Sequence, residues 1–297
     1  MFISVPIIID TRQSKNEQFK DKSAGNQRHK SSLVGTSETT RATTFPYSFW
    51  QWLAGIIDGH ASLQVSKKGH TSLEITIGLE DLPLLRYIQD KLGGSIKIRS
   101  GAKAYRYRLH DKNGIIHCIS NINGYIRHSR RIAQLHRLCQ VLNIPVIIPS
   151  KLSCSSNWFA GFFDAHGIID ISIKTGHIPE LSIHVQNKLV QDLEIYSTVF
   201  NGNIYYDSSR NGHYKWSIQS RTDVLYMLSY FKQIIFKSNK SKRFFLIEEY
   251  YKLFDIKAYC PDNIHHKSFL IFMNKWNKLM IESTSKLNSI LFIHILL

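Results

Sequence analysis

Paired cysteines, long apolar runs and acidic side chains are all scarce in this chain of 297 residues. Its cysteines are scattered and form no CxxC pair, at Cys118, Cys139, Cys154 and Cys260. That spacing argues against a zinc cluster and against a framework of disulfides. We expect four buried, reduced thiols.

No apolar run reaches the ~20 residues that a membrane-spanning helix needs. The apolar stretch at residues 1–9 is too short to span a bilayer and lacks the flanks of a signal peptide. The sequence therefore predicts a soluble, non-secreted protein without a membrane segment.

Acids are outnumbered by bases, with 22 Asp and Glu against 38 Lys and Arg and a net charge of +16. Such an excess creates a positive field that attracts polyanions. Nucleic acid is the expected partner, although a ribosomal or membrane-surface protein could carry the same charge. Hydrophobic residues make up 43% of the chain, enough to build packed cores.

The chain divides by composition and by repetition. Residues 10–45 are rich in Ser, Thr, Lys, Gln and Asn without apolar periodicity, which predicts a disordered leader over residues 1–45. Two repeats are expected to follow, at residues 46–149 and 150–280, and then a C-terminal tail at residues 281–297.

Each repeat is expected to contain a helix, two strands, a second helix, a hairpin and further helices. The predicted strands lie at residues 63–67, 73–77, 95–99 and 105–109, and again at 169–173, 181–185 and in a hairpin over 204–218. Asn211 and Gly212 predict the turn of that last hairpin. The stretch 144–148, which contains Pro145, is expected to be an extended linker and not a central strand.

Similar segments recur at nearly the same offset, LGGSI from residue 92 and FNGNI from residue 200. The first helices also match, with WLAGIIDGH from residue 52 and WFAGFFDAH from residue 158. Together they indicate internal duplication. Glycine costs about 1 kcal/mol relative to alanine inside a helix, so a glycine at the same place in both copies needs a reason. Close approach of the two helices supplies it, with the interface predicted at Ala54, Gly55, Ala160 and Gly161.

The two matched sequences resemble the signature helices of the LAGLIDADG homing endonucleases and their maturase relatives, in the single-chain form with two motifs. The likeness covers roughly residues 46–280. It implies an α+β fold of two pseudo-symmetric αββαββα repeats, with signature helices at the interface and antiparallel sheets that form a nucleic-acid-binding saddle. It also implies a monomer with internal pseudo-dimer symmetry.

The family's members are usually encoded by group I introns, often in organelles. The abundance of Ile, Lys, Asn, Tyr and Phe fits an AT-rich organellar genome, and the expected location is the mitochondrion, with the protein made inside the organelle.

Alternation along the predicted strands separates apolar from polar side chains. Leu63 and Val65 lie on one face, and Gln64 and Ser66 lie on the other. The polar face suits contacts with phosphates or base edges, and a merely solvated face is the alternative. Basic runs follow each second hairpin, and the family keeps a basic residue near the scissile phosphate in this region. The predicted nucleic-acid contacts are Gln64, Ser66, Lys97, Arg99, Arg106, Arg108, Arg130, Lys174, Lys215, Gln219 and Lys240.

In the active nucleases of that family, the eighth residue of each motif is an acid that helps to hold a divalent metal ion. Counted from Leu53 and Phe159, those positions are His60 and His166 here, whereas the sixth-position acids Asp58 and Asp164 are retained. These four are the candidate catalytic positions. Mg²⁺ prefers hard oxygen ligands, which a neutral imidazole does not supply. Residues two apart on a helix point about 200° apart, so Asp58 is not expected to replace a carboxylate at position 60.

We therefore expect no metal site and favour a cleavage-deficient protein that acts as a group I intron splicing maturase. It would grip intron RNA through phosphates and shape. The alternative is an active site-specific double-strand DNA homing endonuclease, with Mg²⁺ as its cofactor. A softer metal bound by histidine, or histidines acting as acid and base, could also support cleavage. Whether the chain is an enzyme stays open at this point, as does the possibility of a decaying reading frame.

Overall fold

The computed structural model describes residues 45–173, 178–209, 211–234 and 236–284. Most of the predicted leader, Lys174 and residues 285–297 of the predicted tail lie outside this part of the chain.

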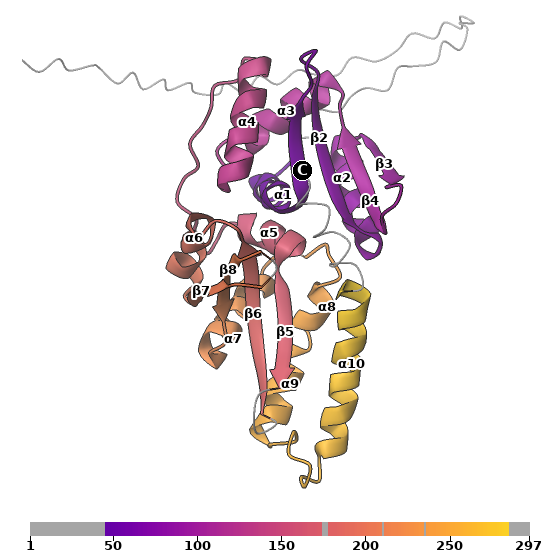
Figure 1. Cartoon of the computed structure of the whole chain (residues 1–297), viewed down its shortest axis with the longest axis vertical. Helices are drawn as coiled ribbons and strands as arrows, with labels where there is room; N and C mark the ends of the chain where they lie inside the picture. Colours follow the sequence, from indigo (N-terminus) through magenta and orange to yellow (C-terminus); the bar gives the residue numbers. More distant parts are fainter. Residues whose placement is uncertain (1–44, 174–177, 210, 235, 285–297) are drawn as a thin grey trace, which may run out of the picture. The chain divides into compact units, whose positions relative to one another are not determined.

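The first repeat begins with the helix that carries the first motif and ends in two further helices (Figure 1). Its elements are α1 (Tyr47–His60), β1 (Ala61–Val65), β2 (Thr71–Gly78), the short 3₁₀ helix η1 (Leu79–Asp81), α2 (Leu82–Leu92), β3 (Ser95–Ile98), β4 (Ala104–Leu109), α3 (Lys112–Ile122) and α4 (Ser129–Leu142). The strands form an antiparallel sheet in the order β1-β2-β4-β3.

The second repeat has the same succession and then continues into additional helices. Its elements are α5 (Trp158–His166), β5 (Ile168–Ile173), β6 (Pro179–Asn187), α6 (Gln191–Phe200), β7 (Asn203–Asp207), β8 (His213–Ile218), α7 (Arg221–Lys232), α8 (Ser241–Phe244), α9 (Ile247–Asp255) and α10 (His266–Thr284). The second sheet is also antiparallel, in the order β5-β6-β8-β7. The predicted α+β fold of two pseudo-symmetric repeats is therefore confirmed.

Strand alternation places the sheets as expected. In β2 the side chains of Leu73, Ile75 and Ile77 are buried, whereas Glu74 and Thr76 lie on the other face. At the predicted turn between β7 and β8, Asn211 and Gly212 both have φ of 67°. Asparagine and glycine tolerate this left-handed region better than other residues, which is why the pair is found in such turns.

The linker between the repeats belongs to neither sheet, as its proline predicts. Asn123, between α3 and α4, binds this linker through both polar atoms of its side-chain amide. Its Nδ2 donates to the carbonyl of Pro145 at 2.7 Å, and its Oδ1 accepts from the amide of Ile147 at 3.0 Å. The linker thus runs along the corner where the two helices meet. At the other end of the chain, α10 continues past the predicted tail boundary at residue 280.

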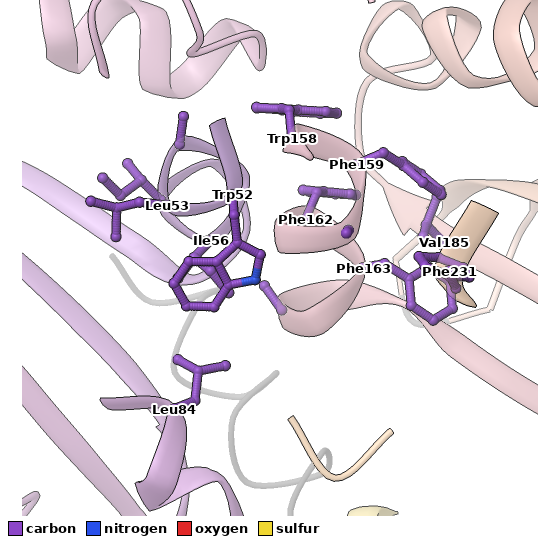
Figure 2. Packing of buried hydrophobic residues seen from close by; sticks show 14 of the residues in the cluster. Trp52, Leu53, Ile56, Leu84, Trp158, Phe159, Phe162, Phe163, Val185 and Phe231 are labelled. Atoms are coloured by element: carbon purple, nitrogen blue, oxygen red, sulfur yellow. The ribbon is translucent and has the colours of Figure 1, made fainter. Parts of the chain in front are cut away.

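One hydrophobic core joins the two motif helices (Figure 2). Leu53 and Ile56 enter it from α1, and Phe159 and Phe163 enter it from α5. Figure 2 shows the Trp52 indole between the two helices. None of the helices in the described ranges is long and apolar enough to cross a membrane.

Candidate functional site

The two motif helices touch through their glycines. A Cβ atom on Gly55 would lie 2.0 Å from the carbonyl oxygen of Trp158, and one on Gly161 would lie 1.9 Å from that of Trp52. Both distances are far shorter than any tolerated contact, so the helices approach backbone to backbone. Ala54 and Ala160, beside these glycines, are fully buried. Small residues in the helix interior are therefore required by the α1–α5 contact.

The same contact contains a reciprocal pair of hydrogen bonds. Trp52 Nε1 in α1 donates to Asp164 Oδ2 in α5 at 2.9 Å, and Trp158 Nε1 in α5 donates to Asp58 Oδ2 in α1 at 2.9 Å. Each repeat thus supplies the indole that satisfies the motif carboxylate of the other. We call these four residues the tryptophan–aspartate clamp.

Each clamp carboxylate also binds the backbone that precedes a later helix of its own repeat. Asp58 accepts from the amides of Arg127 at 2.9 Å and His128 at 3.2 Å, just before α4. Burial raises the pKa of Asp58 to about 7, although these hydrogen bonds oppose the rise. The retained carboxyl is therefore a structural acceptor inside the protein.

The second clamp carboxylate has an equivalent arrangement. Asp164 accepts from the amides of Lys237 at 3.2 Å and Ser238 at 3.0 Å, and also from the Ser238 hydroxyl. Burial raises the pKa of Asp164 too, against the lowering effect of its donors. Neither sixth-position acid has an oxygen directed to solvent for a metal ion, since both side chains are buried.

Two further aspartates, which the sequence did not single out, continue this pattern across the repeats. Asp192, in the first turn of α6, accepts from the amide of Ser129 at 3.0 Å. Asp81, at the start of α2, accepts from the amide of Asn239 at 2.8 Å. Each therefore holds a segment of the opposite repeat. The sequence shows an aspartate at the start of each of these two equivalent helices. It does not show which backbone amides of the opposite repeat the aspartates bind.

His128 adds a buried contact between the repeats. Its Nε2 lies 2.6 Å from the Tyr196 hydroxyl of α6. Burial, reinforced by the nearby charge of Arg131, lowers the pKa of His128 to about 3. The imidazole is consequently neutral near pH 7. Whether Nε2 or the Tyr196 hydroxyl donates the hydrogen in this contact depends on the tautomer of His128.

The eighth-position residues meet at the ends of the motif helices. The ring centroids of His60 and His166 are 4.7 Å apart, with the ring planes tilted by 39°. His166 Nε2 lies 2.9 Å from the carbonyl oxygen of Gly59. Because a carbonyl only accepts, this nitrogen carries the hydrogen and has no lone pair to offer a metal ion.

Basic side chains close the carboxyl-terminal ends of both motif helices. Lys240 Nζ donates to the carbonyls of Phe163, Asp164 and Ala165 at 3.1, 2.8 and 2.7 Å. Arg131 Nε donates to the carbonyl of Ile57 at 3.0 Å in the first repeat. Burial lowers the pKa of Lys240 to about 8, partly offset by nearby acids. The amine predicted to contact nucleic acid is thus directed into the fold as a helix cap.

The first sheet brings several of the predicted contacts together on its polar face. Arg106 is paired in register with Thr76 and Lys97, and Arg108 is paired with Glu74. Arg108 donates to the Glu74 carboxylate, and Arg106 Nη1 lies 3.8 Å from it. Gln64 is exposed on the same face, two residues from Ser62, which pairs with Glu74.

The other predicted contacts are distributed less simply. Arg99 extends the β3–β4 pairing by donating its amide to Ala104, and Ser66 closes the β1–β2 turn, where its hydroxyl accepts from the His70 amide at 3.0 Å. Arg130 is exposed in the first turn of α4. Lys215 lies on the polar face of the second sheet, paired with Gln186, and Gln219 is exposed just beyond β8.

A family model described as LAGLIDADG endonuclease matches residues 53–142 and 159–251, which begin in the two motif helices. The chain belongs to the LAGLIDADG endonuclease family. The two matched ranges correspond to the two repeats of the fold, each starting in a motif helix and including one sheet.

The curated relatives of this chain include proteins named as endonucleases and a protein named as an RNA maturase. The chain is 40% identical over 285 residues to the probable intron-encoded endonuclease aI2 of Debaryomyces hansenii, covering 90% of this chain and 43% of that protein. It is 42% identical over 281 residues to the intron-encoded RNA maturase bI4 of Saccharomyces cerevisiae, covering 84% and 44%. The chain thus spans less than half the length of these two relatives. The intron-encoded DNA endonuclease ai2b of Dictyostelium discoideum is 31% identical over 239 residues, covering 78% and 87%.

Solved structures agree on the fold. The LAGLIDADG homing endonuclease I-LtrWI bound to target DNA matches with a TM-score of 0.60 at 14% identity, covering 77% of this chain and 97% of that one. The meganuclease I-AabMI bound to uncleaved DNA matches with a TM-score of 0.56 at 18% identity and the same coverage. At these identities the likeness establishes the LAGLIDADG fold of this chain and nothing finer.

The family's nucleases depend on divalent metal, but the donor set at these motif ends does not fit Mg²⁺. The two eighth-position side chains supply imidazole nitrogens, and one Nε2 is committed to the Gly59 carbonyl. Within the described ranges, no cluster of three or more His, Cys, Asp or Glu side chains could hold a metal ion. At positions 60 and 166 neither motif end offers a carboxylate oxygen of the kind that Mg²⁺ prefers.

Proposed function

We propose that this protein binds structured intron RNA as a group I intron splicing maturase and does not cleave DNA by the metal-dependent route. The observation that carries the proposal is the pairing of His60 and His166, with ring centroids 4.7 Å apart, at both positions where the family's nucleases have acids. A change in only one repeat could leave half of a metal site. The symmetric change removes the carboxylate from both halves.

Other features of the structure fit a protein that binds without cutting. The clamp, the glycine contact and the helix caps are all in place, so the LAGLIDADG scaffold is intact. The first sheet presents Lys97, Arg106 and Arg108 on its polar face, which suits contacts with phosphates. RNA is recognised largely through phosphates, shape and unpaired bases, none of which requires a metal centre in the protein.

Similarity to the RNA maturase bI4 of yeast supports the RNA assignment, and the names of the relatives support an intron origin. We further propose that the protein acts in mitochondria, and as a monomer whose two repeats take the place of two subunits.

A site-specific double-strand DNA endonuclease is the second candidate. It is favoured by the relatives named endonucleases, including one of which this chain covers 87%. Under this candidate the protein would need a divalent metal, Mg²⁺ in the usual case, held by ligands other than carboxylates at positions 60 and 166. A softer ion bound through imidazole would be the chemically consistent choice.

The two candidates are separated by assays run in parallel on the full chain. Intron-containing precursor RNA is tested for splicing with and without protein, and the intronless insertion-site DNA is tested for cleavage with Mg²⁺, Mn²⁺ or Zn²⁺. We expect faster splicing and no cut DNA. Sequence-specific cleavage at a useful rate with any of these ions would overturn the proposal.

A pair of double variants tests the role of the histidines. His60→Asp with His166→Asp restores two carboxylates, whereas His60→Asn with His166→Asn provides side chains of the same size without charge. Under the proposal, metal-dependent DNA cleavage appears only in the aspartate variant. Equal behaviour of the two variants, with both cutting, would contradict the role assigned to the missing carboxylates.

A further inference from the structure

The strand registers of the two sheets can be compared row by row, because both sheets have the same strand order. In the first sheet, Arg106 of β4 pairs with Thr76 of β2 and Lys97 of β3. In the second sheet, Lys215 of β8 pairs with Gln186 of β6 and Tyr205 of β7. Tyr205 therefore occupies the place of Lys97 on the polar face.

The next row differs even more. In the first sheet Arg108 faces Glu74, and the two form an ion pair. In the second sheet the equivalent places are taken by Ser217 and His184. His184 is buried, and burial lowers its pKa to about 3, so this row carries no charge near pH 7. A charged row in one repeat thus corresponds to an uncharged row in the other.

The two polar faces consequently differ in sign. On the strands of the first face, Lys97, Arg106 and Arg108 are opposed by Glu74. On the strands of the second face, Lys215 is accompanied by three acids, Asp170, Glu180 and Asp207. Asp170 and Asp207 lie near enough to interact electrostatically with the Lys215 amine. A row of phosphates would be attracted to the first face and repelled by the acids of the second.

The second face has features that suit bases instead of phosphates. Tyr205 is 49% exposed and lies on the polar face, paired with Lys215. Its strand, β7, is the outer strand of the sheet (Figure 1). Amide and carboxylate groups of Gln186, Asn203 and Asp170 share that face. Aromatic side chains stack on unpaired bases, and such polar groups can hydrogen-bond the edges that unpaired bases expose.

We infer that the two sheets bind different parts of one RNA, with phosphates of a paired region on the first face and unpaired bases on the second, where Tyr205 stacks on a base. The inference rests on the proposed function, because it assigns the RNA to surfaces within it. The difference in charge favours unequal contacts over a symmetric arrangement on a continuous duplex. An RNA with a helix beside a single-stranded segment satisfies both faces at once.

Three short probes test the inference on the full chain by fluorescence anisotropy. They are a blunt RNA hairpin, the same hairpin with a single-stranded RNA extension, and the hairpin with that extension made of DNA. The extension carries 2-aminopurine, whose fluorescence reports stacking. We expect the RNA extension to tighten binding and its fluorescence to fall on binding.

Two tyrosines on one strand provide a matched pair of variants. Tyr205→Leu removes the ring from the polar face, whereas Tyr206→Leu removes a ring that is 65% exposed on the opposite face. We expect Tyr205→Leu to abolish the fluorescence change and to weaken binding of the extended RNA by about tenfold or more, with the blunt hairpin unaffected. Tyr206→Leu should bind all three probes as the parent protein does.

Salt dependence tests the first face independently. The double change Arg106→Gln, Arg108→Gln should lower the slope of log affinity against log salt by about 1 to 2, and Lys215→Gln should lower it by less. Equal effects of the tyrosine variants, or a larger slope change for Lys215→Gln than for the arginine pair, would overturn the inference alone. Equal binding by the extension made of DNA would overturn its assignment to RNA. Failure to bind any probe would overturn the proposed function as well.

Discussion

Trp52 of the first motif helix donates its indole N–H to Asp164 of the second at 2.9 Å, so a residue of one repeat satisfies a buried carboxylate of the other. The reverse bond, from Trp158 to Asp58, has the same length. The family resemblance placed these aspartates among the catalytic candidates. Their hydrogen bonds instead make them part of the contact that holds the repeats together.

Replacing Trp158 with phenylalanine removes one bond to a buried carboxylate. We expect Trp158→Phe to lower the free energy of unfolding by about 1–3 kcal/mol more than Trp276→Phe does, as measured by urea denaturation. Trp276 is a matched control, since it is buried and its Nε1 has no hydrogen-bond partner among the described residues.

The deficit of Trp158→Phe should also depend on pH. Burial raises the pKa of Asp58 to about 7 from 3.8, and the Trp158 bond opposes that rise. A raised pKa contributes stability that is fully present below the unfolded value of 3.8 and is lost as pH rises through 7. The variant should therefore be more impaired at pH 8 than at pH 5, and an equal deficit at both would show that Trp158 does not act through the carboxylate.

Adding one methyl group at the helix contact should be severely disruptive. In Gly55→Ala the new Cβ would meet the Trp158 carbonyl oxygen at 2.0 Å and the Phe162 amide nitrogen at 2.5 Å, both of them backbone atoms. Overpacking commonly costs about 1–3 kcal/mol, and rigid neighbours put this variant at or above the top of that range.

Gly114→Ala in α3 is the comparison for that experiment. Its Cβ would meet only the flexible end of Leu109 at 3.1 Å and the Asp111 carboxylate at 3.4 Å among the nearest atoms. Since alanine favours a helix by about 1 kcal/mol, its melting temperature should stay level or rise. If both variants melt alike, the α1–α5 contact is looser than the distances indicate.

His184 should make stability depend on acidity. Burial, with a smaller effect of Lys215, lowers its pKa from 6.5 to about 3. The stability that follows from a lowered pKa is fully present above 6.5 and is lost as pH falls toward 3. His184→Gln should therefore reduce the slope of unfolding free energy against pH in this window by about 1.4 kcal/mol per pH unit. The exposed His136→Gln serves as the comparison, and unchanged slopes in both variants would refute the expectation.

Lys240 should matter for stability through the end of α5. Lys240→Met leaves three helix carbonyls without the amine and is expected to lower the free energy of unfolding by about 2 kcal/mol or more. Burial lowers the pKa of Lys240 from 10.5 to about 8. The difference in unfolding free energy between the parent protein and Lys240→Met should therefore grow as the pH rises from 8 to 10.5. Lys232→Met removes an exposed partner of Glu248 and should cost at most about 1 kcal/mol. Equal losses in the two variants would argue against the cap.

Much of the fold could be predicted because its signals are local. Period-two alternation located β2 and β6, the Asn211-Gly212 pair located a turn, and Pro145 marked the linker. Further helices after the first hairpin were predicted, but the place where α3 ends and α4 begins was not. Asn123 lies at that break, and its side chain binds the linker more than 20 residues later.

The site was predicted less completely, because its residues act across the repeats. Glycine in a helix predicted close packing, and the resemblance to the LAGLIDADG family led from two matching histidines to the prediction that no metal site is present. The roles of Asp81, Asp192 and Lys240 had no comparable signal, since each binds backbone groups brought near only by folding.

The sequence by itself determined that the chain contains one unit twice, that two helices need small residues at matching places, and that both matched motifs end in histidine. These properties follow from residue type and spacing along one chain. Only the tertiary structure decided that each motif aspartate is satisfied by the tryptophan of the other repeat, and that the polar faces of the two sheets carry different charges. Both depend on which strands and helices become neighbours, and burial changes the energetic meaning of a side chain only once those neighbours have excluded water from it.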